Sequence, residues 1–247
     1  MHDLTNVGPR IILGFGDGSV FVTESVLFGI MVATVIAVVL VWLGKGLTKS
    51  PSKKQVMAEL IVEFVYNTTQ KTMGPQNLRF APFIGTIFLF VMLGSALGLF
   101  GFRPITADIN TAFALSTITF MVINVSSIRA LGLKGKLQHM CDPYPFMFPI
   151  KFIEMFSLPV SLGFRLFGNI FGGAVVMTLM FTGLASACYA IAKSIPIFGT
   201  IPFLKAGIPL PAMMFFDIFH PIVQAYIFTM LTMVFLSIEI MKHGDDH

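Results

Sequence analysis

Long apolar stretches separated by short polar connections dominate the chain and predict membrane-spanning helices. Crossing the hydrocarbon core of a bilayer takes about 20 mostly apolar residues at a rise of 1.5 Å per residue. Stretches of this kind occupy residues 22–43, 80–102, 111–131, 150–192 and 210–241. The last two are longer than a perpendicular crossing requires, so we expect them to be tilted or kinked and to form one long hairpin over residues 150–241.

The segment 55–73 has a different pattern, with apolar residues at helical spacing and Glu59 and Glu63 four positions apart. This pattern is typical of an amphipathic helix that lies at the membrane interface without spanning the bilayer. Only the short segment RPITADIN separates the second and third stretches, so residues 80–131 should form a helical hairpin. The sequence predicts an all-α polytopic membrane protein: about five transmembrane helices and one interfacial helix in a single domain, residues 1–247.

Composition supports lipid as the solvent of this chain. Of 247 residues, 55% are hydrophobic and 11% are charged, whereas soluble domains carry roughly 25% charged residues. The net charge of +4 does not indicate nucleic-acid binding. The basic residues lie beside apolar stretches, where membrane proteins place them, and form no stripe interleaved with aromatic residues. We expect no nucleic-acid partner, metal or cofactor.

The basic residues also predict an orientation. A dense basic flank follows the first span, and with five spans most of the 16 Lys and Arg residues fall on the same side as this flank. That side is expected to be cytoplasmic, which puts the N-terminus outside and the C-terminus inside. No signal or transit peptide pattern is visible, which favours a bacterial plasma membrane over an organelle inner membrane. Arg165 alone falls within the membrane.

Arg165 lies in the apolar segment SLPVSLGFRLFGNIFGG, residues 157–173. An arginine near the bilayer centre costs about 2.5–3.5 kcal/mol on insertion scales, so its presence indicates a function such as an ion path. Its guanidinium keeps its proton at any ordinary pH and acts as a fixed charge. Ser161, Arg165 and Asn169 are four apart and share a helical face. The structural alternative is an arginine that snorkels or pairs to hold a helix bundle together.

A second polar set lies on the last apolar stretch. Asp217, His220 and Gln224 follow the spacing i, i+3, i+7 of one helical face. Pro221 removes a backbone amide, so we expect a kinked and locally polar backbone there. Asp217 and His220 suit a proton relay, although both residues would also be stable in water at the outer interface.

Other acidic residues have simpler interpretations. Glu154 either lines an inner exit or lies at the interface, and Glu239 is interpreted as a solvated residue near the chain end. Asp108 and its polar neighbours in the outer turn are interpreted as helix caps.

Three separated segments, SLGFRLFGN, QAYIFTMLTMVFLS and RPITADINTAFAL, resemble subunit a of F-type ATP synthases. This subunit is the membrane stator beside the rotating ring of c subunits, and the resemblance covers about half of the chain. It implies a non-catalytic subunit with two offset half-channels for protons or sodium ions, which couple ion flow to ATP synthesis. It also implies contacts with the c ring, the peripheral-stalk b subunits, other subunits of the complex and lipid.

By this resemblance, Arg165 faces the ion-binding carboxylate of each passing c subunit and prevents a direct leak between the half-channels. Asn169 and Gln224 match positions that the family places near this arginine, and Ser161 matches a polar position one turn before it. One departure is visible. Many members pair a Glu or His nine residues after the arginine with a His or Glu on the last helix, whereas this chain has Ala174 and Asp217.

Two other functions remain open at the level of sequence. An independent secondary transporter would use Arg165 to bind an anionic substrate, and a membrane scaffold would use the polar residues for packing. No nucleotide-binding G-x-x-x-x-G-K-[ST] motif occurs, so in an ATP synthase the phosphate chemistry would belong to other subunits.

Overall fold

The computed structural model describes residues 11–15, 20–45, 53–141, 144, 146, 148–194 and 209–240. Within these ranges the chain is almost entirely helical, and five helices are long and apolar enough to cross a membrane. The predicted fold class is therefore confirmed. The predicted connection at residues 195–208 lies outside the described residues. The longer elements are α1 (Glu24–Gly44), α2 (Lys53–Met73), α3 (Ala81–Ala96), α4 (Ile109–Cys141), α5 (Phe148–Ser194) and α9 (His220–Ile240).

Several short elements complete the fold. An antiparallel pair of strands, which the hydrophobic pattern did not predict, precedes α1 and pairs Leu13 with Val22 and Phe15 with Val20. Helix α1 then begins at Glu24, whose carboxylate lies in the first turn, where the helix dipole favours negative charge. The two strands are β1 (Ile11–Phe15) and β2 (Val20–Thr23). The other short elements are the 3₁₀ helices η1 (Pro75–Phe80), η2 (Leu97–Phe100) and η3 (Ile105–Ala107), α8 (Pro209–Met214) and the π-helix η5 (Phe215–Phe219).

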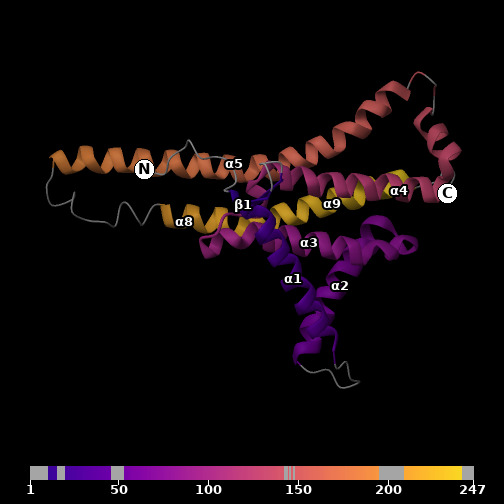
Figure 1. Ribbon diagram of the computed structural model, residues 1–247, viewed down its shortest axis with the longest axis horizontal. Helices are drawn as coiled ribbons and strands as arrows, with labels where there is room; N and C mark the ends of the chain where they lie inside the picture. The colour runs from indigo at the N-terminus through magenta and orange to yellow at the C-terminus, as the bar shows by residue number, and fades with distance from the viewer. Residues whose placement is uncertain are drawn as a thin grey trace.

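The long helices are arranged in two directions. Helices α3, α4, α5 and α9 run along the length of the molecule, whereas α1 descends from its middle at a steep angle (Figure 1). Helix α5 has 47 residues, which corresponds to roughly 70 Å at the usual helical rise. It is longer than a hydrocarbon core about 30 Å thick, and membranes accommodate helices of this length by tilting or bending them. Pro159 lies inside this helix, and a proline is a common cause of a bend.

Helix α4 contains a sharp break that its hydrophobic pattern does not reveal. Gly132 has φ 74° and ψ 165°, so the chain changes direction there and continues as helix to Cys141. Only glycine adopts such a backbone without strain. The break lies next to the predicted end of the third span, near residue 131, although the apolar helical stretch extends to Gln138. The sequence did not predict that the basic connection after it is helical.

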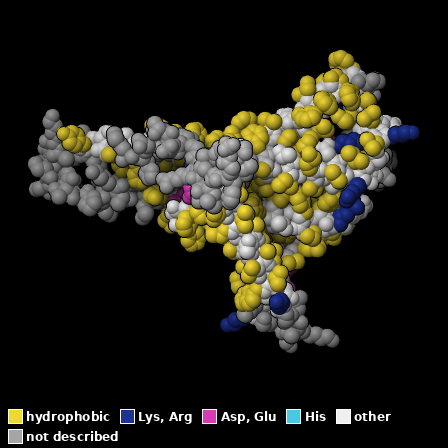
Figure 2. Space-filling view, viewed as in Figure 1, with side chains coloured by type: hydrophobic (Ala, Val, Ile, Leu, Met, Phe, Trp, Pro, Cys, Tyr) yellow, Lys and Arg dark blue, Asp and Glu magenta, His cyan; other side chains and the backbone are white. Residues whose placement is uncertain are grey.

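The core of the molecule lies where α3, α4, α5 and α9 meet. Its buried side chains come in pairs from the four helices: Ile87 and Val91, Ala112 and Leu115, Leu162 and Leu166, Ala225 and Phe228. Outside this core, large apolar side chains are exposed along the long helices. In Figure 2 such side chains cover much of the visible surface, while Lys and Arg gather at the end near the C-terminus and at the far end of the α1–α2 pair. This distribution is typical of a lipid-facing protein.

Close approach of α5 to α4 depends on Gly163. A Cβ atom at this position would lie 3.1 Å from Ser116 Oγ and 3.2 Å from the ring of Phe113. We expect Gly163→Val to lower the free energy of unfolding in mild detergent by roughly 1–3 kcal/mol, because overpacking forces the two helices apart. Gly29→Val on α1, where no atom lies within 4 Å of the added carbon, is the matched control. Equal stability of both variants and the unaltered chain would show that the contact is not tight.

Candidate functional site

Arg165 lies on the flank of α5, at the edge of the core. Its neighbours Leu162 and Leu166 are 1% and 0% exposed and face inward, which leaves Arg165 half-buried and Phe164 exposed. Among the described residues, Arg165 forms no hydrogen bond or ion pair. Its guanidinium is therefore held in place by the packing of its own helix and is available to a group from outside the chain.

Asn169, one turn after Arg165, joins α5 to α9. Its side-chain Nδ2 donates a hydrogen bond to Oε1 of Gln224. Gln224 is 2% exposed, and its Nε2 is buried without a hydrogen-bond partner among the described residues. The structure thus brings together two residues that the sequence assigned to one site, although 55 positions separate them. Ser161, the third member of the predicted polar stripe, is exposed.

A cavity of about 320 Å³ begins at this pair, and we name it the Asp217 cavity. Its polar lining comes from three parts of the fold and consists of Ser95, Asn169, Asp217, His220 and Gln224. The apolar remainder of its wall includes Ala174, Met177 and Phe216. The predicted set on the last helix therefore does share one face, and Asn169 joins it there.

The backbone around Asp217 is irregular, as Pro221 predicted. Residues Phe215–Phe219 form a π-helix between α8 and α9, and regular α-helix resumes at His220. Because a π-helix has an extra residue per turn, it changes the direction in which side chains point, and such segments occur frequently at functional sites. His220 Nε2 is buried with no hydrogen-bond partner among the described residues. A buried polar atom of this kind requires a water, an ion or a transferable proton.

A second cavity, of about 230 Å³, lies toward the other end of α5 and α9, and we name it the Glu239 cavity. Its charged lining residues are Lys136, Lys151, Glu154 and Glu239. Glu154, which is exposed, was predicted either to line an inner exit or to lie at the interface, and the structure places it on this cavity wall. Glu239 accepts a hydrogen bond from Ser127 Oγ at 3.2 Å.

Comparison with known protein families agrees with this arrangement. The family model described as ATP synthase A chain matches residues 26–237. The chain belongs to the ATP synthase A chain family. Its function is accordingly ion translocation within the membrane stator of an F-type ATP synthase.

Individual relatives cover most of the chain. ATP synthase subunit a of Moorella thermoacetica is 30% identical over 97% of this chain and 100% of its own length. The subunit a of Bacillus subtilis is 30% identical over 90% of this chain and 94% of its own length. A relative named as sodium ion specific, from Propionigenium modestum, is 30% identical over 79% of this chain and 66% of its own length.

The structure corrects the interpretation of Glu239 as a simply solvated end residue. Glu239 is half-buried, accepts a hydrogen bond from Ser127 and lines the same cavity as Glu154. Lys136 was assigned only to a basic connection, yet it is 9% exposed and lines the same cavity. One feature of the sequence points to this site. Glu154 and Glu239 lie near the two ends of the hairpin predicted over residues 150–241, and the two ends of a hairpin lie on the same side.

The packing shows how the glycines after Arg165 and the residue Asp108 are used. Gly173 admits a neighbouring segment, because an added Cβ there would lie 3.0 Å from the ring of Phe216. A Cβ added at Gly168 or Gly172 would have no neighbouring atom within 4 Å. Asp108 is confirmed as a helix cap, because its Oδ1 accepts the backbone N–H of Asn110 at 3.0 Å.

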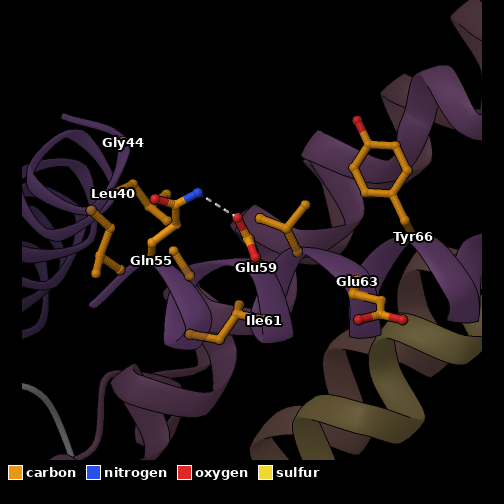
Figure 3. Close-up of a pocket in the computed structure, with 10 residues that line it drawn as sticks. Leu40, Gly44, Gln55, Glu59, Ile61, Glu63 and Tyr66 are labelled. Carbon is orange, nitrogen blue, oxygen red and sulfur yellow. Dashed lines mark hydrogen bonds between the residues drawn. The ribbon is translucent and has the colours of Figure 1, made fainter. Parts of the chain in front are cut away.

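A third and larger hollow, of about 620 Å³, lies away from these residues, between the end of α1 and the first half of α2. Figure 3 shows Leu40 and Gly44 on its α1 side and Gln55, Glu59 and Glu63 along α2. Gln55 Nε2 donates a hydrogen bond to Glu59 Oε1 at 2.7 Å. None of the predicted site residues lines this hollow, so its size alone does not connect it with ion movement.

The contact between Asn169 and Gln224 can be measured as a coupling energy. We expect a double-mutant cycle with Asn169→Ala and Gln224→Ala to give a coupling of about 0.5–1.5 kcal/mol in the free energy of unfolding in detergent. Thr178→Ala provides a matched control, because Thr178 Oγ1 bonds only the carbonyl of Ala174 within α5. In a double-mutant cycle with Gln224→Ala, the change that Thr178→Ala makes in the free energy of unfolding should simply add to that of Gln224→Ala. Additivity in the Asn169 cycle as well would mean that the two amides do not interact.

Proposed function

We propose that this chain is the non-catalytic ion-channel subunit of a rotary ATP synthase and that Arg165 separates two offset half-channels. The Asp217 cavity is the outer half-channel, and the Glu239 cavity is the inner one. Ions pass through one half-channel to a carboxylate of the c ring and leave through the other after the ring has turned. The coupling of this flow to rotation supports ATP synthesis in the catalytic part of the complex.

The order of residues along α5 is the observation that carries this proposal. Lys151, Glu154 and Leu158 line the Glu239 cavity, Arg165 follows, and the Asp217 cavity begins at Asn169. The gap of 11 residues from Leu158 to Asn169 corresponds to roughly 16 Å of helix.

Helix α9 repeats this order. The Asp217 cavity ends at Gln224, and the lining of the Glu239 cavity starts at Phe235. Between them Ala225, Phe228 and Met233 are each 0% exposed. Packed apolar side chains thus separate the two cavities on α9 at the place where Arg165 separates them on α5.

The chemistry of the guanidinium suits a barrier of this kind. Arginine stays charged when it is partly buried, and it attracts the ionised form of a carboxylate that comes near. A c-ring carboxylate that arrives with a bound ion would release it beside Arg165 and become an anion. A free cation, in contrast, is repelled, which prevents direct leakage between the cavities.

The outer path in this proposal uses Asp217 and His220 as its titratable groups. Both line the Asp217 cavity, and the opposite wall has Ala174, which cannot titrate. Gly98 in η2 lies beside the carboxylate, since an added Cβ there would be in ordinary van der Waals contact with Asp217 Oδ1 at 3.6 Å. Asp217 in η5 therefore acts without an ionisable partner nine residues after Arg165, and Asn169 and Gln224 complete the route with polar amides.

The proposed setting follows from the family and the charge pattern. The partners are the c ring, the peripheral-stalk b subunits, the other subunits of the complex and membrane lipid. The membrane is a bacterial plasma membrane, with the N-terminus outside and the C-terminus in the cytoplasm, since the basic flanks gather on the cytoplasmic side. The ion is a proton or a sodium ion, and the c-ring site has a large part in that choice.

Replacement of Arg165 tests the proposal directly. In membrane vesicles that retain the assembled complex, Arg165→Gln should reduce ATP-driven ion pumping to background, because the fixed charge that releases the ion and blocks the leak is gone. Thr178→Ala, on the exposed side of the same helix, is the control and should pump normally. Unchanged coupled pumping in Arg165→Gln would refute the proposed function.

Asp217→Asn tests the outer half-channel separately. The amide keeps the size of the side chain and loses its ability to exchange a proton, so we expect pumping to fall at least several-fold. Passive ion flow driven by an imposed gradient should fall by a similar factor. A rate equal to that of the unaltered complex would assign the outer path to other residues.

A further inference from the structure

Lys136 is a buried cation that the proposed half-channels do not yet use. It is 9% exposed, and its Nζ donates a hydrogen bond to Oδ1 of Asn124 on the same helix. Asn124 is itself oriented, because its Nδ2 donates to the backbone carbonyl of Phe120 at 2.9 Å. The amide therefore presents only its oxygen to the ammonium group. A lysine is rarely buried without such a partner.

The break at Gly132 makes this contact possible. Asn124 and Lys136 are 12 residues apart, a separation of roughly 18 Å along a continuous helix, which exceeds the reach of a lysine side chain. The positive φ of Gly132 turns the last part of α4 back toward its own middle. The backbone thus directs Lys136 inward, whereas Lys134, two positions earlier, is exposed.

The ammonium group shares the Glu239 cavity with three other charged side chains. Lys136 comes from α4, Lys151 and Glu154 come from α5, and Glu239 comes from α9. Two cations and two carboxylates therefore line one small space, and their formal charges cancel. A metal cation needs several oxygen ligands to replace its hydration shell, and positive charge beside those ligands opposes its binding. This cavity offers carboxylate oxygens, but its ammonium groups compete for them.

We propose that Lys136 is a specificity-determining residue of the inner half-channel, where its ammonium group excludes sodium and other metal cations from the Glu239 cavity. Protons pass because they move between the carboxylates and water and need no coordination shell. This inference rests on the proposed function of the cavity as the inner half-channel. It commits the complex to proton transport, which the family alone does not decide.

Two variants of nearly unchanged shape remove the charge balance in different ways. Lys136→Gln keeps a donor for Asn124 Oδ1 and loses the cation. Asn124→Asp keeps Lys136 and adds a neutralising carboxylate beside it. The first change leaves the cavity lining with one net negative charge, and the second cancels the charge of Lys136 from the side chain that it bonds. Both should therefore have the same effect, and the inference can be tested with whichever variant assembles. Lys136→Arg retains the cation, and Lys134→Gln removes an exposed charge from the same helix as a matched control.

The measurement is the initial rate of ATP-driven proton pumping by the assembled complex in inverted vesicles, in sodium chloride and in choline chloride at equal ionic strength. We expect sodium to slow Lys136→Gln and Asn124→Asp by at least about fivefold, because a removed or neutralised charge a few ångströms away changes cation binding strongly. The unaltered complex, Lys136→Arg and Lys134→Gln should be insensitive to sodium.

Two outcomes would overturn the inference. One is an assembled Lys136→Gln or Asn124→Asp complex that pumps equally fast in both salts. The other is an unaltered complex that requires sodium or is inhibited by it. Neither outcome would affect the dependence of coupled pumping on Arg165, so failure of this inference is distinguishable from failure of the proposed function.

Discussion

The packing of Leu162 and Leu166 into the core fixes the position of Arg165, and the proposed function depends on that position. These two leucines contact buried residues of α3, α4 and α9, so α5 cannot rotate without moving them into lipid. Because lipid tails are as apolar as leucine, what these side chains would lose in lipid is close van der Waals packing rather than shelter from water. The charge is therefore held at the flank of α5 by apolar contacts on either side of it.

Glycine and irregular backbone create the space around this charge. Gly163 allows α5 to approach α4, and Gly173 allows it to approach Phe216. The π-helix Phe215–Phe219 turns Asp217 toward the cavity. The result is a pair of hollows at the two ends of a packed region, with one polar pair, Asn169 and Gln224, at the edge nearest Arg165. Such an arrangement suits two half-channels that do not meet.

The sequence predicted those features that depend on local pattern. Apolar length predicted the five long helices, the isolated charge drew attention to Arg165, and helical spacing placed Asp217, His220 and Gln224 on one face. The pairing of Asn169 with Gln224 was expected only through resemblance to a family. These predictions succeed because a membrane restricts backbone structure mainly to helices, whose periodicity is readable.

The features that the sequence did not predict depend on backbone direction. Lys136 reaches Asn124 only because Gly132 adopts a positive φ, and nothing distinguishes this glycine in sequence from Gly135. Glu239 meets Ser127 across 112 positions, a contact set by how α4 and α9 cross. The short strands before α1 have no hydrophobic alternation long enough to be recognised.

Access of water to the two cavities from opposite sides is the most direct measurement of the central claim. In a complex whose native cysteines are replaced, Met177→Cys would report on the Asp217 cavity and Met155→Cys on the Glu239 cavity. The account predicts that a membrane-impermeant thiol reagent modifies Met177→Cys only from outside and Met155→Cys only from the cytoplasmic side. Modification of both cysteines from the same side would contradict a barrier at Arg165.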